Sequence, residues 1–387
     1  MRPTPDSIAD RPSDREVYLD FLRAASLIVV VLFHWAFTIL EFRPDQVKAS
    51  NPIGTTPGLW ALTWVLQVVP LFFFAGGYIH FRSWERARSR GITWWRFAVT
   101  KWRRLVVPAL GVVLAWVAVG AIIGLVKDVP WISSAVLLIV SPLWFLGVYA
   151  VLVLLAPATV WLHRRWGLKV VVALVGVAML LDMLRFVRGY GWAGWLNLLV
   201  IWSFCHQMGM HYGSLVELKR RTRWILVLGG AFGLLLLTSL APYPRSMVGV
   251  PADGVSNAAP PTLAMGALLL LQVGLALIMR DRVLDRLTHS RRWAAINDLA
   301  GRFSMPLYLL HTTGFVVALG MVYLGLSYLP PSSSSGAWWI ERPAWVALST
   351  LVTVPIVLVG SRVLGGQPES PEGPEGTGEV FDAGTVE

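Results

Sequence analysis

Ionisable side chains inside apolar stretches are the residues of this sequence that are best placed to do chemistry, because hydrocarbon accommodates them only at a cost. The first apolar stretch contains Arg23 and, eleven residues later, His34. At 3.6 residues per turn this spacing is three turns plus about 20°, so both side chains share one helix face, roughly 16 Å apart. A neutral imidazole is suited to taking a proton from a hydroxyl. A histidine between helices can equally be a structural hydrogen-bond partner.

Other polar side chains accompany this pair. Asp20 precedes Arg23 by three residues, so the two can form an ion pair at the end of the helix. In a later apolar stretch Ser304, Tyr308 and His311 share one helix face. They either line the same cavity or hydrogen-bond a neighbouring helix.

The remaining buried polar residues favour structural roles. His206 and His211 are five residues apart and point in different directions from a helix, so we predict no metal site there. Asp182 and Arg185, at a spacing of three, are expected to neutralise each other. The single cysteine, Cys205, lies in an apolar run and excludes both a disulfide framework and a cysteine-based metal site.

The elements that must hold these residues are membrane helices. The chain has 387 residues, of which 56% are hydrophobic and only 14% are charged, whereas soluble domains have about 25% charged residues. Apolar runs of 18 or more residues recur, and each can cross a bilayer as a helix. We predict an all-α polytopic membrane bundle of about ten helices, at 19–40, 59–81, 105–126, 142–162, 168–187, 192–213, 224–241, 262–279, 303–328 and 343–361.

The basic residues predict the orientation of this bundle. If the N-terminus is cytoplasmic, the clusters at 82–104, 164–169, 219–223 and 280–302 all lie inside, as the positive-inside rule requires. Both termini are then cytoplasmic, and the protein is a multi-pass protein of the plasma membrane. Topology therefore accounts for the net charge of +11, and we predict no nucleic-acid partner.

The domain organisation follows from the same composition. Residues 1–18 are expected to form a cytoplasmic segment and residues 19–362 the membrane domain. Residues 363–387 are rich in Gly, Pro and acidic side chains, which predicts a disordered cytoplasmic tail. Residues 131–140 are expected to form a short interfacial or re-entrant segment.

Five short motifs, in order along the chain, resemble signatures of the acyltransferase 3 family of membrane-bound O-acyltransferases, and the resemblance spans about residues 16 to 362. In place of the family's usual Ser and Arg, this chain has Gly76 and Lys101. The motifs are Tyr18-x-Asp20-x-x-Arg23 with His34, Pro70 to Tyr78, Lys101 to Pro108, Leu143 to Leu146, and Gly301 to His311.

The resemblance implies a reaction. The donor is acyl-CoA, in the first place acetyl-CoA, arriving from the cytoplasm as a substrate and not as a permanently bound cofactor. The acceptor is a hydroxyl of a glycan or lipid-linked sugar. Lys101 and Arg104, with Arg103, would attract the donor phosphates. Arg23 would bind phosphate or hold Asp20, and His34 would act as a general base or carry the acyl group itself.

A transporter of a polar or acylated metabolite is the alternative interpretation. In it the buried Arg23, His34 and His311 would line a path through the membrane. Transporters often have two halves with matched broken helices. This chain has Pro70 and Pro142 in its first half, with Pro306 as the one counterpart in the second, so we rank this alternative lower.

Overall fold

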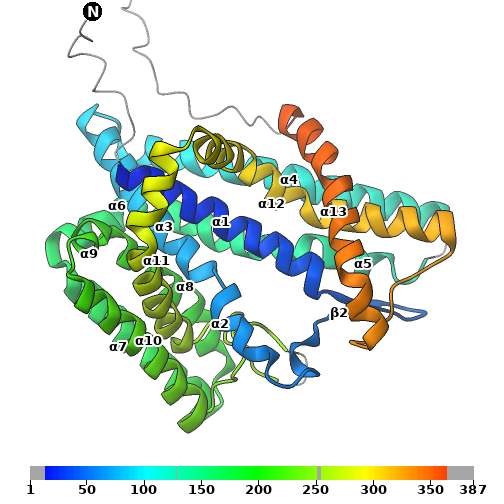
Figure 1. Cartoon of the computed structure of the whole chain (residues 1–387), viewed down its shortest axis with the longest axis horizontal. Helices are drawn as coiled ribbons and strands as arrows, with labels where there is room; N and C mark the ends of the chain where they lie inside the picture. Colours follow the sequence, from blue (N-terminus) through cyan, green and yellow to red (C-terminus); the bar gives the residue numbers. More distant parts are fainter. Residues whose placement is uncertain (1–13, 128, 251–253, 364–387) are drawn as a thin grey trace, which may run out of the picture.

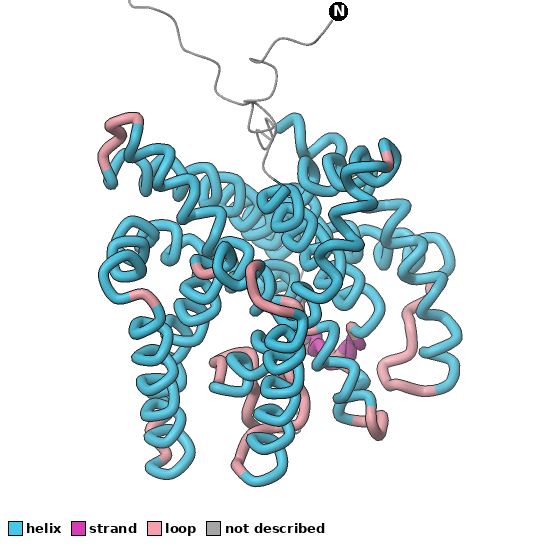
Figure 2. Tube along the Cα trace, turned by 60° about the vertical axis from the view of Figure 1, so that its left-hand side comes forward, coloured by secondary structure: helices cyan, strands magenta, loops and turns pink. Residues whose placement is uncertain are grey.

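The computed structural model describes residues 14–127, 129–250 and 254–363. This part of the chain is a bundle of helices with one two-stranded sheet (Figures 1 and 2). Nine of its helical segments are long and apolar enough to cross a membrane. The predicted all-α polytopic fold is therefore confirmed. Most of the predicted N-terminal segment and of the predicted tail lies outside the described residues.

The helices follow one another along the chain with few interruptions. The first half contains α1 (Asp14–Phe37), α2 (Thr63–Leu66), α3 (Val69–Ser89), α4 (Trp94–Val126), α5 (Ile132–Val140) and α6 (Trp144–Trp166). The second half contains α7 (Leu168–Arg188), α8 (Gly191–Met210), α9 (Tyr212–Val216), α10 (Arg220–Leu240), α11 (Leu263–His289), α12 (Arg291–Leu326) and α13 (Gly336–Val363).

Several helices are longer than their apolar cores. Helix α4 begins at Trp94 and α12 at Arg291, although the apolar runs predicted starts near residues 105 and 303. Arg and Lys are good helix formers, so a helix can continue through a basic segment that hydropathy marks as a loop. As a consequence the basic motif from Lys101 to Arg104 lies on a helix and not in a loop before it.

Helix α8, the counterpart of the predicted crossing at 192–213, is not among the nine described segments that are long and apolar enough to cross a membrane. It carries Asn197, His206 and Gln207, all of which are buried. It packs against α3 and α7, so protein rather than lipid covers its polar side chains. Neighbouring helices supply hydrogen-bond partners for two of these side chains, since Asn197 donates to Asp182 of α7 and His206 bonds His80 of α3.

The ends of two predicted elements differ from the structure. Helix α1 stops at Phe37, and the following residues form an antiparallel hairpin of β1 (Ile39–Phe42) and β2 (Val47–Ser50). Residues 132–140 form α5, which leads through one 3₁₀ turn at Ser141–Leu143 into α6. The hairpin and α5 lie together, since the Val47 amide donates to the Ser134 hydroxyl at 2.7 Å.

Asp182 is a junction of helices and not one half of an ion pair. Its carboxylate accepts from Asn197 at 2.9 Å, from the Tyr243 hydroxyl at 3.0 Å and from the first amide of α11 at 2.8 Å. Arg185 acts on it electrostatically but donates to a backbone carbonyl of the loop before α11. The predicted mutual neutralisation is thus replaced by a hydrogen-bonded anchor of α7, α8 and α11.

Helices α3 and α8 cross with their backbones in contact. A Cβ atom placed on Gly77 would lie 1.8 Å from the His206 carbonyl oxygen, and one on Gly209 would lie 1.8 Å from the Phe74 carbonyl oxygen. No larger residue fits there, because the obstacle is backbone on each side. This close approach fixes the register of the two helices.

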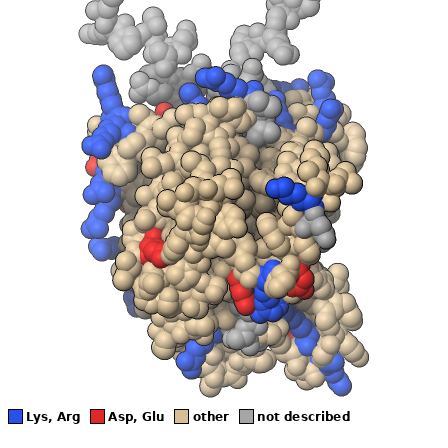
Figure 3. Space-filling view, turned by 90° about the vertical axis from the view of Figure 1, so that its right-hand side faces the viewer, with Lys and Arg blue, Asp and Glu red and all other residues tan. Residues whose placement is uncertain are grey.

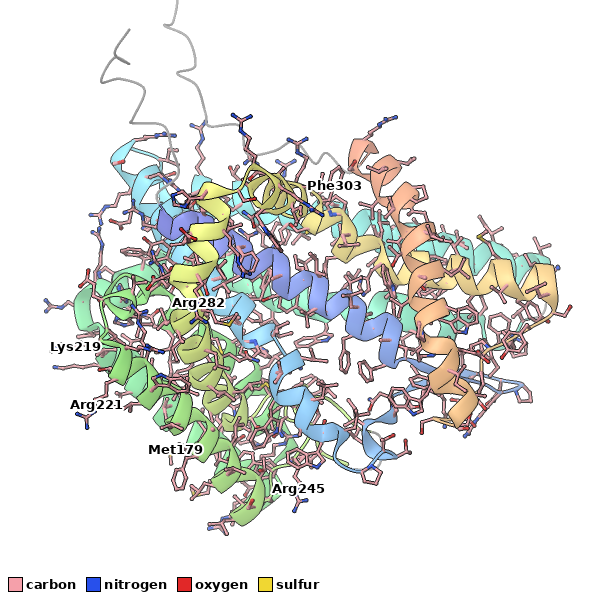
Figure 4. All side chains as sticks on the ribbon, in the orientation of Figure 1. Met179, Lys219, Arg221, Arg245, Arg282 and Phe303 are labelled. Atoms are coloured by element: carbon pink, nitrogen blue, oxygen red, sulfur yellow. The ribbon has the colours of Figure 1, made fainter. Side chains whose placement is uncertain are left out.

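The charged residues are distributed as membrane crossing requires. Lys219 and Arg221 lie at one end of α10, and Arg245 lies beyond its other end (Figure 4). On the face shown in Figure 3, a broad uncharged area separates groups of basic side chains.

Candidate active site

His34 and His311 form a hydrogen-bonded pair in the interior of the bundle. His34 lies in the last turn of α1 and His311 lies in the middle of α12. Their Nδ1 and Nε2 atoms are 2.9 Å apart. The rings stack with centroids 5.0 Å apart and planes at 16°. The pair therefore joins α1 to α12 through imidazole nitrogens, which are also the atoms that can accept or donate a proton.

The surroundings of His311 determine which nitrogens of the neutral pair carry protons. His311 Nδ1 lies 2.6 Å from the Tyr308 carbonyl oxygen, which can only accept, so Nδ1 carries the proton. Nε2 of His311 is then an acceptor, and His34 Nδ1 must donate to it. This leaves a lone pair on His34 Nε2.

The two histidines differ in access. His311 is fully buried, and Trp35 donates its indole N–H to the His311 carbonyl at 3.0 Å. His34 is only partly buried, and among the described residues its hydrogen bonds involve Nδ1 and not Nε2. His34 can therefore present a free lone pair to a ligand, whereas His311 can only hold the ring of His34 in place.

Arg23 lies on α1 three turns before His34, as the spacing predicted. It pairs with Asp20, with 3.7 Å between Nη1 and Oδ1, and both side chains are partly exposed. Its guanidinium lies 5.9 Å from the centre of the Phe72 ring. Its Nε atom is buried without a hydrogen-bond partner in the described part of the chain. The pair with Asp20 is thus present, and one donor of Arg23 is still available.

The predicted phosphate-binding residues occupy the first third of α4. Lys101 is partly buried, whereas Arg103 and Arg104 are exposed. Lys101 and Arg104 are three residues apart and share a helix face, and Arg103 points elsewhere. The charges of both Arg23 and Lys101 act on His80 of α3, so these two cations border the same part of the bundle.

Ser304 and Tyr308 use their hydroxyl groups within the protein. The Ser304 hydroxyl donates to the Gly301 carbonyl one turn earlier at 2.9 Å. The Tyr308 hydroxyl donates to the Pro142 carbonyl at 2.5 Å, and its ring stacks on His311 with centroids 5.9 Å apart. Of the three residues that share this face of α12, His311 is the one that reaches His34.

A second histidine pair was not foreseen from the sequence. His80 Nδ1 lies 2.9 Å from His206 Nε2, and the Tyr149 hydroxyl lies 3.2 Å from His80 Nε2. All of these side chains are buried. His80 lies one turn after Gly76 and Gly77 on α3. Its position in an apolar run was the sequence feature that could have identified it as a candidate site residue. In the described residues no three potential ligands are grouped for a metal ion.

A family model described as an acyltransferase domain matches residues 16–362. No curated protein and no solved structure matches the chain significantly. The match covers nearly the whole chain, so the protein belongs to this family of acyltransferases, as its motifs indicated. It is a multi-pass membrane enzyme that transfers acyl groups.

Proposed function

We propose that the enzyme transfers an acyl group, in the first place acetyl, from cytoplasmic acyl-CoA to a hydroxyl of a glycan or another envelope or secreted acceptor. The observation that carries this proposal is the chain from the Tyr308 carbonyl through His311 to His34, which leaves the lone pair of His34 Nε2 free. A base with a fixed tautomer and an open nitrogen suits proton abstraction from a hydroxyl.

The proposed reaction follows from this geometry. His34 Nε2 takes the proton of the acceptor hydroxyl as its oxygen attacks the thioester carbonyl. The hydrogen bond from Nδ1 to His311 strengthens as His34 becomes positive. When the tetrahedral intermediate collapses, the C–S bond breaks and the thiolate takes the proton from Nε2. His34 returns to its neutral state and no net proton is released.

The donor is proposed to lie along α1. Its phosphates would contact Lys101 and Arg104. Arg103 would contribute less, because its side chain points away from the face that Lys101 and Arg104 share. Arg23 would complete this basic entrance, since it has an unfilled Nε and borders the same buried histidine as Lys101. From Arg23 to His34 the helix rises roughly 16 Å, which matches an extended pantetheine arm.

The acyl group could also reside on His34 during turnover, because the same free Nε2 atom is a nucleophile. Rapid quenching of the enzyme with radiolabelled acetyl-CoA, without acceptor, separates the two routes. A label bound to the protein and absent from His34→Gln would establish the relay. An unlabelled protein that still transfers acetyl supports the general-base route.

The reaction itself is tested in cells and with pure protein. Mass spectrometry of envelope glycans from a strain lacking the gene should show the loss of an acetyl or longer acyl mass. Purified protein should release free CoA from acetyl-CoA in the presence of the affected glycan. Identical glycan masses in both strains, together with no CoA release, would refute the proposed function.

A further inference from the structure

Arg342, on the second turn of α13, is a buried cation with an unused donor. It is 5% exposed, and no carboxylate of the described residues lies within ion-pair distance of it. Its Nε atom donates to the Trp338 carbonyl at 3.2 Å, and Nη1 donates to the Thr38 carbonyl at 3.4 Å. Nη2 is buried and has no partner in the described part of the chain. Leaving a charged buried donor unfilled is unfavourable, so a ligand that accepts from it would be stabilised.

A second unfilled donor lies against the first. Trp338 is fully buried, and its indole Nε1 has no acceptor among the described residues. The guanidinium of Arg342 stacks on this indole, with 4.2 Å between Cζ and the ring centroid. Two N–H donors without partners in the described part of the chain therefore lie on neighbouring, stacked groups.

The nearest carboxylate is already in use. Glu341 precedes Arg342 and acts on it electrostatically. One of its oxygens accepts from the Tyr328 hydroxyl, and the other accepts from the Trp345 indole at 3.1 Å. Tyr328 and Trp345 thus hold the Glu341 carboxylate, and it supplies no acceptor to Nη2 of Arg342 or to Nε1 of Trp338.

The location connects this pair of donors with the active site. The Thr38 amide donates to the His34 carbonyl at 3.2 Å, and the Thr38 carbonyl accepts from Arg342. Arg342 thus lies about one helical turn beyond His34, at the end of α1 away from Arg23. The start of α13 lies beside this end of α1, near the β1–β2 hairpin (Figure 1). A group bound here would be on the opposite side of His34 from the proposed donor.

We propose that Arg342 and Trp338 bind an anionic group of the acceptor, so that the acceptor class is an acidic one carrying a carboxylate or a phosphate near the acylated hydroxyl. This rests on the proposed function. Arginine is a preferred partner of both oxyanions, and the unfilled Nη2 of Arg342 and the indole N–H of Trp338 are the two donors offered here. Nη1 of Arg342 contacts the Thr38 carbonyl at the end of α1, and Nε bonds within α13, but neither contact accounts for Nη2 or for Trp338 Nε1.

Binding is tested first, without turnover. The full-length protein in lipid-free maltoside micelles is heated with methyl glucuronide, with methyl glucoside 6-phosphate or with uncharged methyl glucoside. At least one of the two anionic sugars should raise the melting temperature, and Arg342→Gln should abolish the shift. Trp338→Phe, which keeps the aromatic stack but removes the N–H, should reduce it. Arg245→Gln is the matched control, because Arg245 is exposed and lies over a tryptophan ring at 5.8 Å.

A further sample receives phosphatidylglycerol in place of the sugar, and three outcomes overturn the inference. The first is the absence of a shift with both anionic sugars, and the second is an equal shift in wild type and Arg342→Gln. The third is a shift that only phosphatidylglycerol produces and that Arg342→Gln removes, which would make this a lipid headgroup site. If Arg342→Gln fails to fold, Trp338→Phe replaces it, because this variant leaves Arg342 and its contact with the Thr38 carbonyl in place. An anion-induced shift equal to that of wild type would then overturn the inference.

Turnover then gives the second test. Wild-type enzyme with acetyl-CoA should prefer the anionic sugar over methyl glucoside by about tenfold or more in kcat/KM, as a charged hydrogen bond provides. Arg342→Gln should reduce this ratio to about one and leave the KM for acetyl-CoA unchanged. Equal kcat/KM values of the wild-type enzyme for the anionic sugar and for methyl glucoside would overturn the inference. Anion binding without any acetyl transfer would instead refute the proposed function and leave the anion site in place.

Discussion

At the scale of single residues, the chemistry depends on His34 having a defined partner. His311 differs from the carboxylate of a typical catalytic triad because it is neutral, and a backbone carbonyl fixes its tautomer. His311 therefore acts as a positioning residue, and its contribution should depend on its ability to accept a hydrogen bond.

Replacement of His311 tests this role. His311→Phe removes the acceptor for His34 Nδ1, so the imidazole can turn or change tautomer, and we expect kcat to fall about 100-fold. His311→Gln offers an amide oxygen as acceptor and should recover part of the loss. The KM for acetyl-CoA should stay the same in both variants. Equal activity of the two variants would show that His311 only fills space.

Tyr308 was expected either to line a substrate cavity with Ser304 and His311 or to form a hydrogen bond within the protein, and the structure favours the second. Its hydroxyl donates to the Pro142 carbonyl. Tyr308→Phe should therefore destabilise the protein by roughly 1 to 2 kcal/mol in a thermal or denaturant unfolding experiment. The KM for acetyl-CoA should not change, because the hydroxyl is not free to contact the donor. A raised KM at unchanged stability would favour the substrate cavity instead.

At the scale of helices, the α3–α8 crossing determines where the second histidine pair lies. Gly77→Ala would force a methyl group against the His206 carbonyl oxygen, which cannot move aside. We expect a loss of about 3 kcal/mol or more, visible as aggregation in detergent gel filtration. Gly229→Ala is the control, because a Cβ there meets no atom within 4 Å. A well-folded Gly77→Ala protein would contradict the close crossing.

The basic residues in the first third of α4 are proposed to bind the phosphates of the donor. The double variant Lys101→Ala with Arg104→Ala removes both cations from one face and should raise the KM for acetyl-CoA about tenfold or more. Arg103→Ala, on another face, should have a smaller effect. Steady-state kinetics at varied acetyl-CoA measure both. A lower kcat at unchanged KM would contradict phosphate binding.

The elements show what one sequence reveals and what it does not. Hydropathy located the membrane helices because each apolar run is local, and helical periodicity placed Arg23 and His34 on one face. The partner of His34 is 277 residues away, and no local pattern specifies such a contact. His80 was missed for the same reason, since its partner His206 lies on a helix that is distant in the sequence. The starts of α4 and α12 were misplaced because hydropathy does not detect a helix outside the membrane.

At the scale of the whole molecule, the two proposed substrates approach His34 from opposite sides. The basic residues that we assign to the donor and the buried donors near Arg342 lie at opposite ends of α1 relative to His34. This arrangement requires Lys219 to be cytoplasmic and Arg245 to be outside, which is the orientation that the positive-inside rule predicts.

Labelling of single cysteines tests this orientation. Cys205 is buried and gives little background. A membrane-impermeant maleimide added to intact cells should label Arg245→Cys, and it should label Lys219→Cys only after the membrane is permeabilised. Both positions are exposed and lie beyond opposite ends of α10. The reverse pattern would invert the topology and the proposed direction of transfer.

The central claim is that His34 Nε2 performs the proton transfer or the nucleophilic attack. The most direct measurement is the rate of acetyl transfer from acetyl-CoA by wild type and His34→Ala in nanodiscs, together with acetyl-CoA binding and the melting temperature of each protein. We predict that His34→Ala binds acetyl-CoA and melts as wild type does, with kcat lower by about 10³-fold. A folded His34→Ala protein that transfers acetyl groups at the wild-type rate would contradict the account.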